Sequence, residues 1–163
     1  MGDDLAAMLG EALRERGATI GTAESCTGGL IASTITDTAG SSAYMRGGVV
    51  AYDNDVKMRV LGVPEQTLIA HGAVSEQTAA AMARGVRALL TVDYALSVTG
   101  IAGPGGGTAS KPVGLTYIGL AGADDLMVVA RHVWAGDRVE NKVASVRAAL
   151  ELALKHLRQQ ADG

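Results

Sequence analysis

A candidate nucleophile and a candidate base each follow a predicted strand. Ser25 lies in TIGTAESCTGGLIAS, residues 19–33, where a short β-branched run enters a helical pattern. Lys57 lies in the helix predicted after a second strand that ends near Tyr52. A serine hydroxyl is a weak nucleophile until a base removes its proton, and a partly desolvated lysine can act as that base. The pattern is consistent with serine acyl-transfer chemistry. Its structural alternatives are a solvated helix face for Lys57 and a half-buried strand position for Tyr52.

The turn after Ser25 is unusually small and polar. Thr27, Gly28 and Gly29 follow it before the helix begins. A tight strand-to-helix turn needs the conformational freedom of glycine, and the free N–H groups at a helix start can hold an anion or an oxyanion. The alternative is that Ser25 or Thr27 only caps the helix and that the glycines allow close packing.

Cys26 is a competing nucleophile, because a helix N-terminus lowers the pKa of a thiol. None of the three histidines, His71, His132 and His156, is well placed in the pattern for a Ser-His-Asp triad or for activating the cysteine. Ser25 is therefore favoured over Cys26. Because the residues after Ser25 lack the lysine of an S-x-x-K motif, any lysine base must come from elsewhere in the fold.

A glycine-rich loop follows a third strand that ends at Thr99 and Gly100. The segment GIAGPGGGT lacks the Lys-Ser/Thr pair of a P-loop, and no G-x-G-x-x-G pattern follows the first strand. The loop, residues 100–107, is either a flexible connection or a backbone cradle for phosphate. Arg138, at the start of the last predicted helix, is either a ligand for phosphate or carboxylate or an ordinary surface arginine.

Composition excludes several classes of function. The formal net charge of -3, with mixed signs, provides no basic stripe for nucleic acid, and one Trp, four Tyr and no Phe leave little for base stacking. The single cysteine cannot form an internal disulfide, and no Cys/His cluster indicates a metal site. The acidic N-terminus and the absence of an apolar run of roughly 18 residues predict an untargeted cytoplasmic protein without membrane contact.

Strand and helix patterns alternate along the chain, which predicts an α/β fold. Helices are expected at 3–17, 30–35, 54–62, 65–71, 75–91 and 137–156, and strands at 18–23, 48–52, 94–100, 113–121 and 126–135. The last two strands are expected to pair as a hairpin across 122–125. The order of elements predicts a single-domain α/β/α sandwich over residues 1–163, with a mixed, mostly parallel sheet.

The assembled motifs resemble the CinA C-terminal domain family, including its stand-alone nicotinamide mononucleotide deamidases. The matching stretches are TAESCTGGLIAS, GSSAYMRGGVVAYDNDVKMRVLGV, HGAVSEQTAAAMA, VTGIAGPGGGTASKPVG and GDRVENK, in the family's order over residues 19–142. The glycine loop has Ala109-Ser110 where many relatives have Pro-Glu. Longer members carry an additional N-terminal domain resembling molybdopterin-binding proteins, which this chain is expected to lack.

The resemblance implies hydrolysis of the carboxamide of nicotinamide mononucleotide to nicotinic acid mononucleotide and ammonia, with no metal or organic cofactor. It implies that Ser25 is the nucleophile and that Tyr52 and Lys57 activate it, while N–H groups around Thr27, Gly28 and Gly29 stabilise the oxyanion. The residues matched to the family's substrate loop and GDR arginine are Thr99, Gly100, Ala102, Gly103 and Arg138. A homodimer is expected from the family.

Two other functions stay open from the sequence. The first is a non-catalytic nucleotide-binding or interaction module associated with competence or recombination. The second is hydrolysis of a different amide or pyridine nucleotide, because the sequence does not display what the pocket excludes. No role is predicted for Lys111.

Overall fold

A buried strand, β1, lies at the centre of the parallel part of the sheet. The computed structural model describes residues 3–163, so the first two residues of the acidic N-terminal segment lie outside the described part. The elements in chain order are α1 Asp3–Arg16, β1 Ile20–Glu24, α2 Leu30–Thr36, the 3-10 helix η1 Ser41–Ala43, β2 Met45–Val50, α3 Asn54–Leu61, α4 Glu65–His71, α5 Glu76–Leu90, β3 Tyr94–Gly100, β4 Leu115–Ala121, β5 Met127–Val133 and α6 Arg138–Ala161.

The strands form one sheet in the order β2-β1-β3-β4-β5. β1 pairs in parallel with β2 and β3, whereas β4 runs antiparallel to both β3 and β5. Four strands therefore share one direction and only β4 opposes them. The carboxyl ends of β1, β2 and β3 meet at one edge, the usual place for a ligand site in an open α/β sheet.

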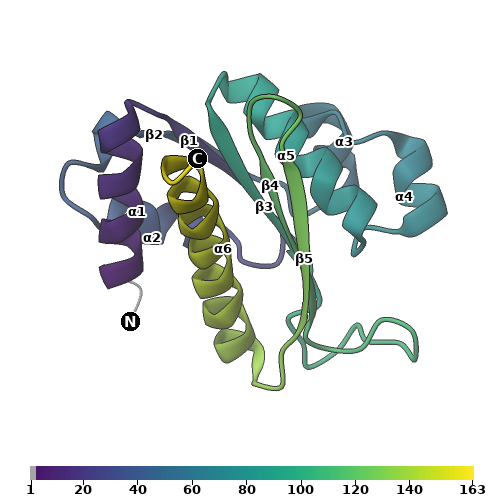
Figure 1. Cartoon of the computed structure of the whole chain (residues 1–163). Coiled ribbons are helices and arrows are strands. Elements are labelled where there is room, and N and C mark those ends of the chain that lie inside the picture. Colours follow the sequence, from purple (N-terminus) through teal and green to yellow (C-terminus); the bar gives the residue numbers. More distant parts are fainter. Residues whose placement is uncertain (1–2) are drawn as a thin grey trace.

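Helices cover both faces of the sheet (Figure 1). One apolar cluster joins α1, α2 and α6 to one face through residues such as Leu13, Ile31 and Leu150. A second cluster joins α3 and α5 to the other face and includes Met82 and Val86. The predicted α/β/α sandwich with a mixed, mostly parallel sheet is confirmed. Among residues 3–163, no helix has both the length and the apolar character needed to cross a membrane.

The predicted limits of the second strand and of the last helix were wrong. The second strand was expected at 48–52, but β2 covers Met45–Val50, and Tyr52 lies in the turn before α3. The two glycines of β2 weaken its strand pattern in the sequence. Pairing with β1 from Ile20 nevertheless extends the strand toward Met45. The last helix continues past residue 156 to Ala161, because Leu157 still packs into the core.

Candidate active site

Ser25 and Lys57 meet at the carboxyl edge of the sheet. Lys57 Nζ lies 3.1 Å from Ser25 Oγ and 3.1 Å from the backbone carbonyl of Tyr52. The Ser25 N–H donates to the Val98 carbonyl at 3.0 Å, which fixes the residue directly beyond β1. Asp53 caps α3 by accepting from the Asp55 N–H, so Lys57 sits in the first turn of that helix, facing the sheet. The fold therefore brings together two residues that are 32 positions apart.

Burial weakens the proton affinity of Lys57. The side chain is 1% exposed, and withdrawal from water lowers its pKa, because the charged form loses more hydration than the neutral form. The negative charge of Asp53 opposes this effect without reversing the direction. A lysine whose pKa is lowered in this way supplies more neutral amine, the form that accepts a proton from a hydroxyl.

Cys26 lines the same cavity, but its pKa is shifted in the opposite direction from that of Lys57. Its side chain is buried, and burial raises the pKa of the thiol to about 11. The nearby Glu24 carboxylate also raises it, while Lys142 and Lys57 lower it. A thiol with this pKa is protonated near neutral pH and is a poor nucleophile. These electrostatics favour Ser25 over Cys26.

The turn between Ser25 and α2 requires its glycines. Gly28 and Gly29 have φ angles of +61° and +100°, in the left-handed region that glycine tolerates best. The Gly28 N–H donates to the Ser25 carbonyl at 3.1 Å, so it is already used in the turn. Within residues 3–163, the N–H groups of Thr27 and Gly29 have no hydrogen-bond acceptor. None of these three residues lines the cavity beside Ser25.

Glu24 is a functional candidate that sequence reasoning missed. Its carboxylate is buried and accepts hydrogen bonds from the Thr27 hydroxyl at 2.7 Å and from the N–H groups of Ile31 and Ala32 at 2.7 and 3.0 Å. The N-cap residue of α2, Gly29, offers no side-chain cap. An acid at a buried strand end, followed by a helix start without a capping side chain, was the available signal.

Arg138 and Tyr52 meet across the mouth of the site. Arg138 donates one hydrogen bond to the Gly103 carbonyl at 2.6 Å and another to the Tyr52 hydroxyl at 3.2 Å. The Tyr52 side chain is 62% exposed, unlike the half-buried position considered as an alternative from sequence. The phenol thus bonds to Arg138, and Tyr52 contacts Lys57 through its backbone carbonyl.

The residues matched to the substrate loop form the wall opposite Ser25. Thr99 is buried and its hydroxyl donates to the Ala73 carbonyl at 2.7 Å, which holds the segment before α5 against β3. A Cβ on Gly100 would lie 2.7 Å from Thr116 Oγ1, so the strand end accepts only glycine without rearrangement. The Ala102 carbonyl accepts from the buried Asn141 side chain at 3.0 Å, a tether that the sequence did not reveal.

These groups enclose a cavity of about 280 Å³ at the carboxyl ends of β1 and β3. Of the predicted site residues, those that line it are Ser25, Tyr52, Lys57, Thr99, Gly100, Ala102, Gly103 and Arg138. Asn54, at the start of α3, also lines it and was not predicted. Within residues 3–163, no three His, Cys, Asp or Glu side chains lie where they could hold a metal ion together.

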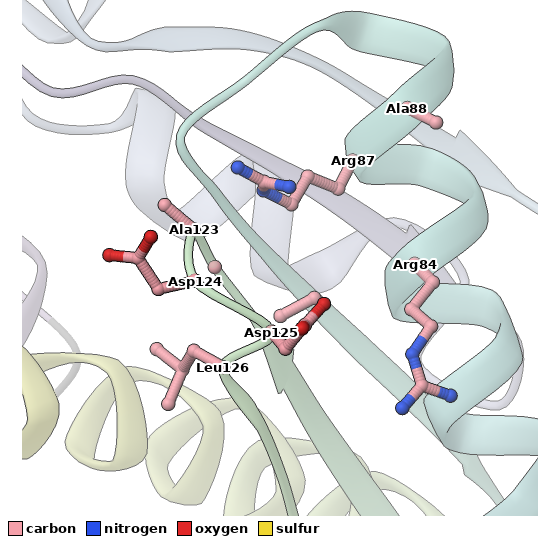
Figure 2. A pocket seen from close by; sticks show the side chains of 9 residues that line it. Arg84, Arg87, Ala88, Ala123, Asp124, Asp125 and Leu126 are labelled. Atoms are coloured by element: carbon pink, nitrogen blue, oxygen red, sulfur yellow. The ribbon is translucent and has the colours of Figure 1, made fainter.

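A larger cavity of about 570 Å³ lies at the opposite end of the sheet (Figure 2). Arg84 and Arg87 of α5 line one side, and the turn between β4 and β5, with Asp124 and Asp125, lines the other. It contains none of the predicted site residues. It also lacks a serine, cysteine or lysine, so its lining provides no nucleophile for acyl transfer.

Comparison with known proteins matches residues 2–157 to the family model described as the CinA C-terminal domain. A competence-damage inducible protein of Halothermothrix orenii is 52% identical over 150 residues, which cover 92% of this chain and 36% of that protein. A CinA-like protein of Leptospira borgpetersenii is 47% identical over 158 residues, covering 97% of this chain and 38% of the relative. The chain thus spans little more than a third of the length of these relatives.

Solved structures give the same picture. The competence/damage inducible protein CihA from Agrobacterium tumefaciens superposes with a TM-score of 0.93 at 43% identity, covering 96% of this chain and 95% of the other. A CinA superfamily protein from Klebsiella pneumoniae superposes with a TM-score of 0.94 at 31% identity, covering 98% and 99% of the two chains.

Proposed function

The chain belongs to the CinA C-terminal domain family, and from this premise we propose that it is an amidohydrolase that converts nicotinamide mononucleotide to nicotinic acid mononucleotide and ammonia. The observation that carries the proposal is the 3.1 Å contact between buried Lys57 and Ser25. It pairs a nucleophile with a base whose pKa is lowered by burial. A nucleophile activated by such a base can attack the carbonyl carbon of an amide.

The reaction proceeds in two halves. Neutral Lys57 takes the proton of Ser25 as Oγ attacks the carboxamide carbon, and the tetrahedral intermediate then expels ammonia, which receives its proton from Lys57. Water next attacks the acyl-serine while Lys57 accepts its proton; the bond between the acyl carbon and Ser25 Oγ then breaks, Lys57 returns the proton to Oγ, and the carboxylate product leaves. The N–H groups of Thr27 and Gly29, two residues that do not line the cavity, are the proposed oxyanion donors.

The wall of the cavity opposite Ser25 recognises the mononucleotide in this proposal. Arg138, held beside the glycine loop by its bond to the Gly103 carbonyl, supplies the positive charge and the donors for a phosphate. Tyr52 orients Arg138 through its hydroxyl and Lys57 through its carbonyl. A homodimer and a cytoplasmic location are further proposals, and light scattering of the purified chain tests the first.

The test compares turnover of nicotinamide, its riboside, its mononucleotide and the dinucleotide without added metal, following ammonia release. We expect the mononucleotide to give the highest kcat/KM, and Arg138→Met to lower kcat/KM for the mononucleotide about tenfold or more while changing the riboside little. Equal activity on free nicotinamide and the mononucleotide would show that binding of the phosphate does not contribute to recognition.

A second candidate function comes from the relatives, which are named as competence-damage inducible proteins. Under it, the chain is a non-catalytic nucleotide-binding or interaction module. A thermal shift induced by nicotinamide mononucleotide, without ammonia release from the folded wild-type protein, favours that function over the amidohydrolase.

A further inference from the structure

We propose that Glu24 is a positioning residue for Ser25, acting through the hydrogen bonds that hold the turn between β1 and α2. This inference rests on the proposed use of Ser25 as a nucleophile. It does not depend on which amide is the substrate.

The turn has a buried ionisable anchor. The Glu24 side chain is 1% exposed, and within residues 3–163 it forms no ion pair with a lysine, arginine or histidine. Burying a carboxylate without a cation is costly unless hydrogen bonds replace its hydration. The Thr27 hydroxyl and two backbone N–H groups replace it here, at 2.7 to 3.0 Å.

These bonds clamp both ends of the nucleophile's segment. The Ile31 and Ala32 N–H groups belong to the first turn of α2, and the Thr27 hydroxyl belongs to the turn itself. Glu24 is the last residue of β1 and immediately precedes Ser25. One side chain therefore ties the strand end, the turn and the helix into a single unit.

The position of Ser25 depends on the Glu24 hydrogen bonds, because few other interactions hold the Ser25 side chain. Ser25 has its N–H fixed by Val98, but among residues 3–163 its hydroxyl forms a hydrogen bond only with Lys57. Cys26 and Thr27 are buried, but Gly28 and Gly29 have positive φ and no side chain, so the second half of the turn has no side-chain packing to fix it. Displacing a nucleophile by about 1 Å can cost about 10²-fold in rate. Loosening the Glu24 clamp should therefore slow Ser25 chemistry.

The test measures the reactivity of Ser25 directly with phenylmethylsulfonyl fluoride, so it needs no amide substrate. In this reaction Ser25 Oγ forms a bond to sulfur, the S–F bond breaks, fluoride departs and Lys57 accepts the hydroxyl proton. Mass spectrometry of the Ser25 peptide gives the labelling rate. Thermal melts confirm that each variant is folded at the assay temperature.

Glu24→Gln and Thr27→Val are expected to label Ser25 about 10-fold or more slowly than wild type. The Glu24→Gln change would place an NH₂ group against a backbone N–H, and Thr27→Val would remove the hydroxyl donor. Thr27→Ser keeps that donor and is expected to give back most of the rate. Thr34→Val is the matched control, because it removes a threonine hydrogen bond from the same helix, to Leu30, without touching Glu24.

Wild-type labelling rates in folded Glu24→Gln and Thr27→Val would overturn the inference. Equal slowing by Thr34→Val would also overturn it, since general loosening of α2 would then be the cause. A wild-type protein that labels at Ser25 but releases no ammonia from nicotinamide mononucleotide would remove the proposed substrate. The positioning role would then be judged by the labelling rates alone.

Discussion

At the residue scale, the site depends on how burial shifts the pKa values of Lys57 and Cys26. Lys57 and Cys26 lie beside Ser25, and desolvation favours the neutral form of each. For the lysine this produces a base, and for the thiol it suppresses a nucleophile. The same dry environment therefore selects the serine hydroxyl for attack.

The raised pKa of Cys26 predicts slow alkylation. The ordinary thiol value of 9.0 is raised to about 11, so the thiolate fraction at pH 8 falls about 100-fold. We expect iodoacetamide to label the folded protein at least that much more slowly than the protein unfolded in guanidinium, with the rate rising as the pH approaches 11. Fast labelling of the folded protein at pH 7 would contradict the assignment of Cys26 as a protonated bystander.

From the lowered pKa of Lys57 we predict that this residue is needed for activity but lowers the stability of the fold. Because its pKa is lowered in the folded state, the unfolded chain binds more protons between the folded and unfolded pKa values, and stability rises with pH across that interval. Lys57→Met removes the cost of burying the amine, so it should abolish turnover and raise Tm at pH 7 by about 2–4 °C, the equivalent of about 1 kcal/mol. Calorimetry at pH 7 and at pH 10 measures both effects.

The gain in Tm from Lys57→Met should shrink at pH 10, where wild-type Lys57 is neutral in a larger share of unfolded molecules. A variant that is less stable than wild type at both pH values would show that the lysine's hydrogen bonds outweigh its desolvation. The lowered pKa would then have little effect on stability.

At the element scale, the turn between β1 and α2 places Ser25 beside Lys57 at the carboxyl edge of the sheet. Alternating strand and helix patterns and the glycines after Thr27 were readable from sequence because both follow local rules of conformation. The Glu24 clamp spans only three to eight residues, and its local signal, an acid before a helix start without a capping side chain, was missed. The Asn141 tether had no such signal, because it joins residues 39 positions apart whose proximity depends on the complete fold. The limits of β2 were missed for a related reason, since cross-strand pairing overrode the weak propensity of its glycines.

Gly29→Ala tests the turn. Its φ of +100° is unfavourable for alanine, and the new Cβ would lie 3.3 Å from Val50 Cγ2. We expect a loss of about 1–2 kcal/mol in the free energy of unfolding and a fall in kcat of at least about tenfold. Gly17→Ala is the matched control, because Gly17 has a φ of +59°, no atom within 4 Å of the new Cβ and a place far from the site in α1's terminal turn.

Urea unfolding and steady-state turnover separate the two glycine variants. Gly17→Ala should lose about 1 kcal/mol in stability with wild-type kcat. If both variants kept wild-type kcat, the conformation of the turn would not be limiting for catalysis. If both lost kcat equally, stability alone would account for the effect.

At the scale of the whole molecule, the five-stranded sheet gathers one wall of the site from β1 and α3 and the other from β3, the glycine loop and α6. All these elements lie within 163 residues, although the chain spans only 36% and 38% of the length of two similar proteins. We therefore predict that the residues of this chain are enough to form the proposed catalytic site.

The most direct measurement is the intact mass of the protein quenched during turnover of nicotinamide mononucleotide, together with ammonia release from wild type and Ser25→Ala. We predict an adduct on Ser25 with the mass of the mononucleotide minus ammonia, and no adduct or ammonia from Ser25→Ala. Ammonia release by folded Ser25→Ala at the wild-type rate would contradict the serine–lysine mechanism.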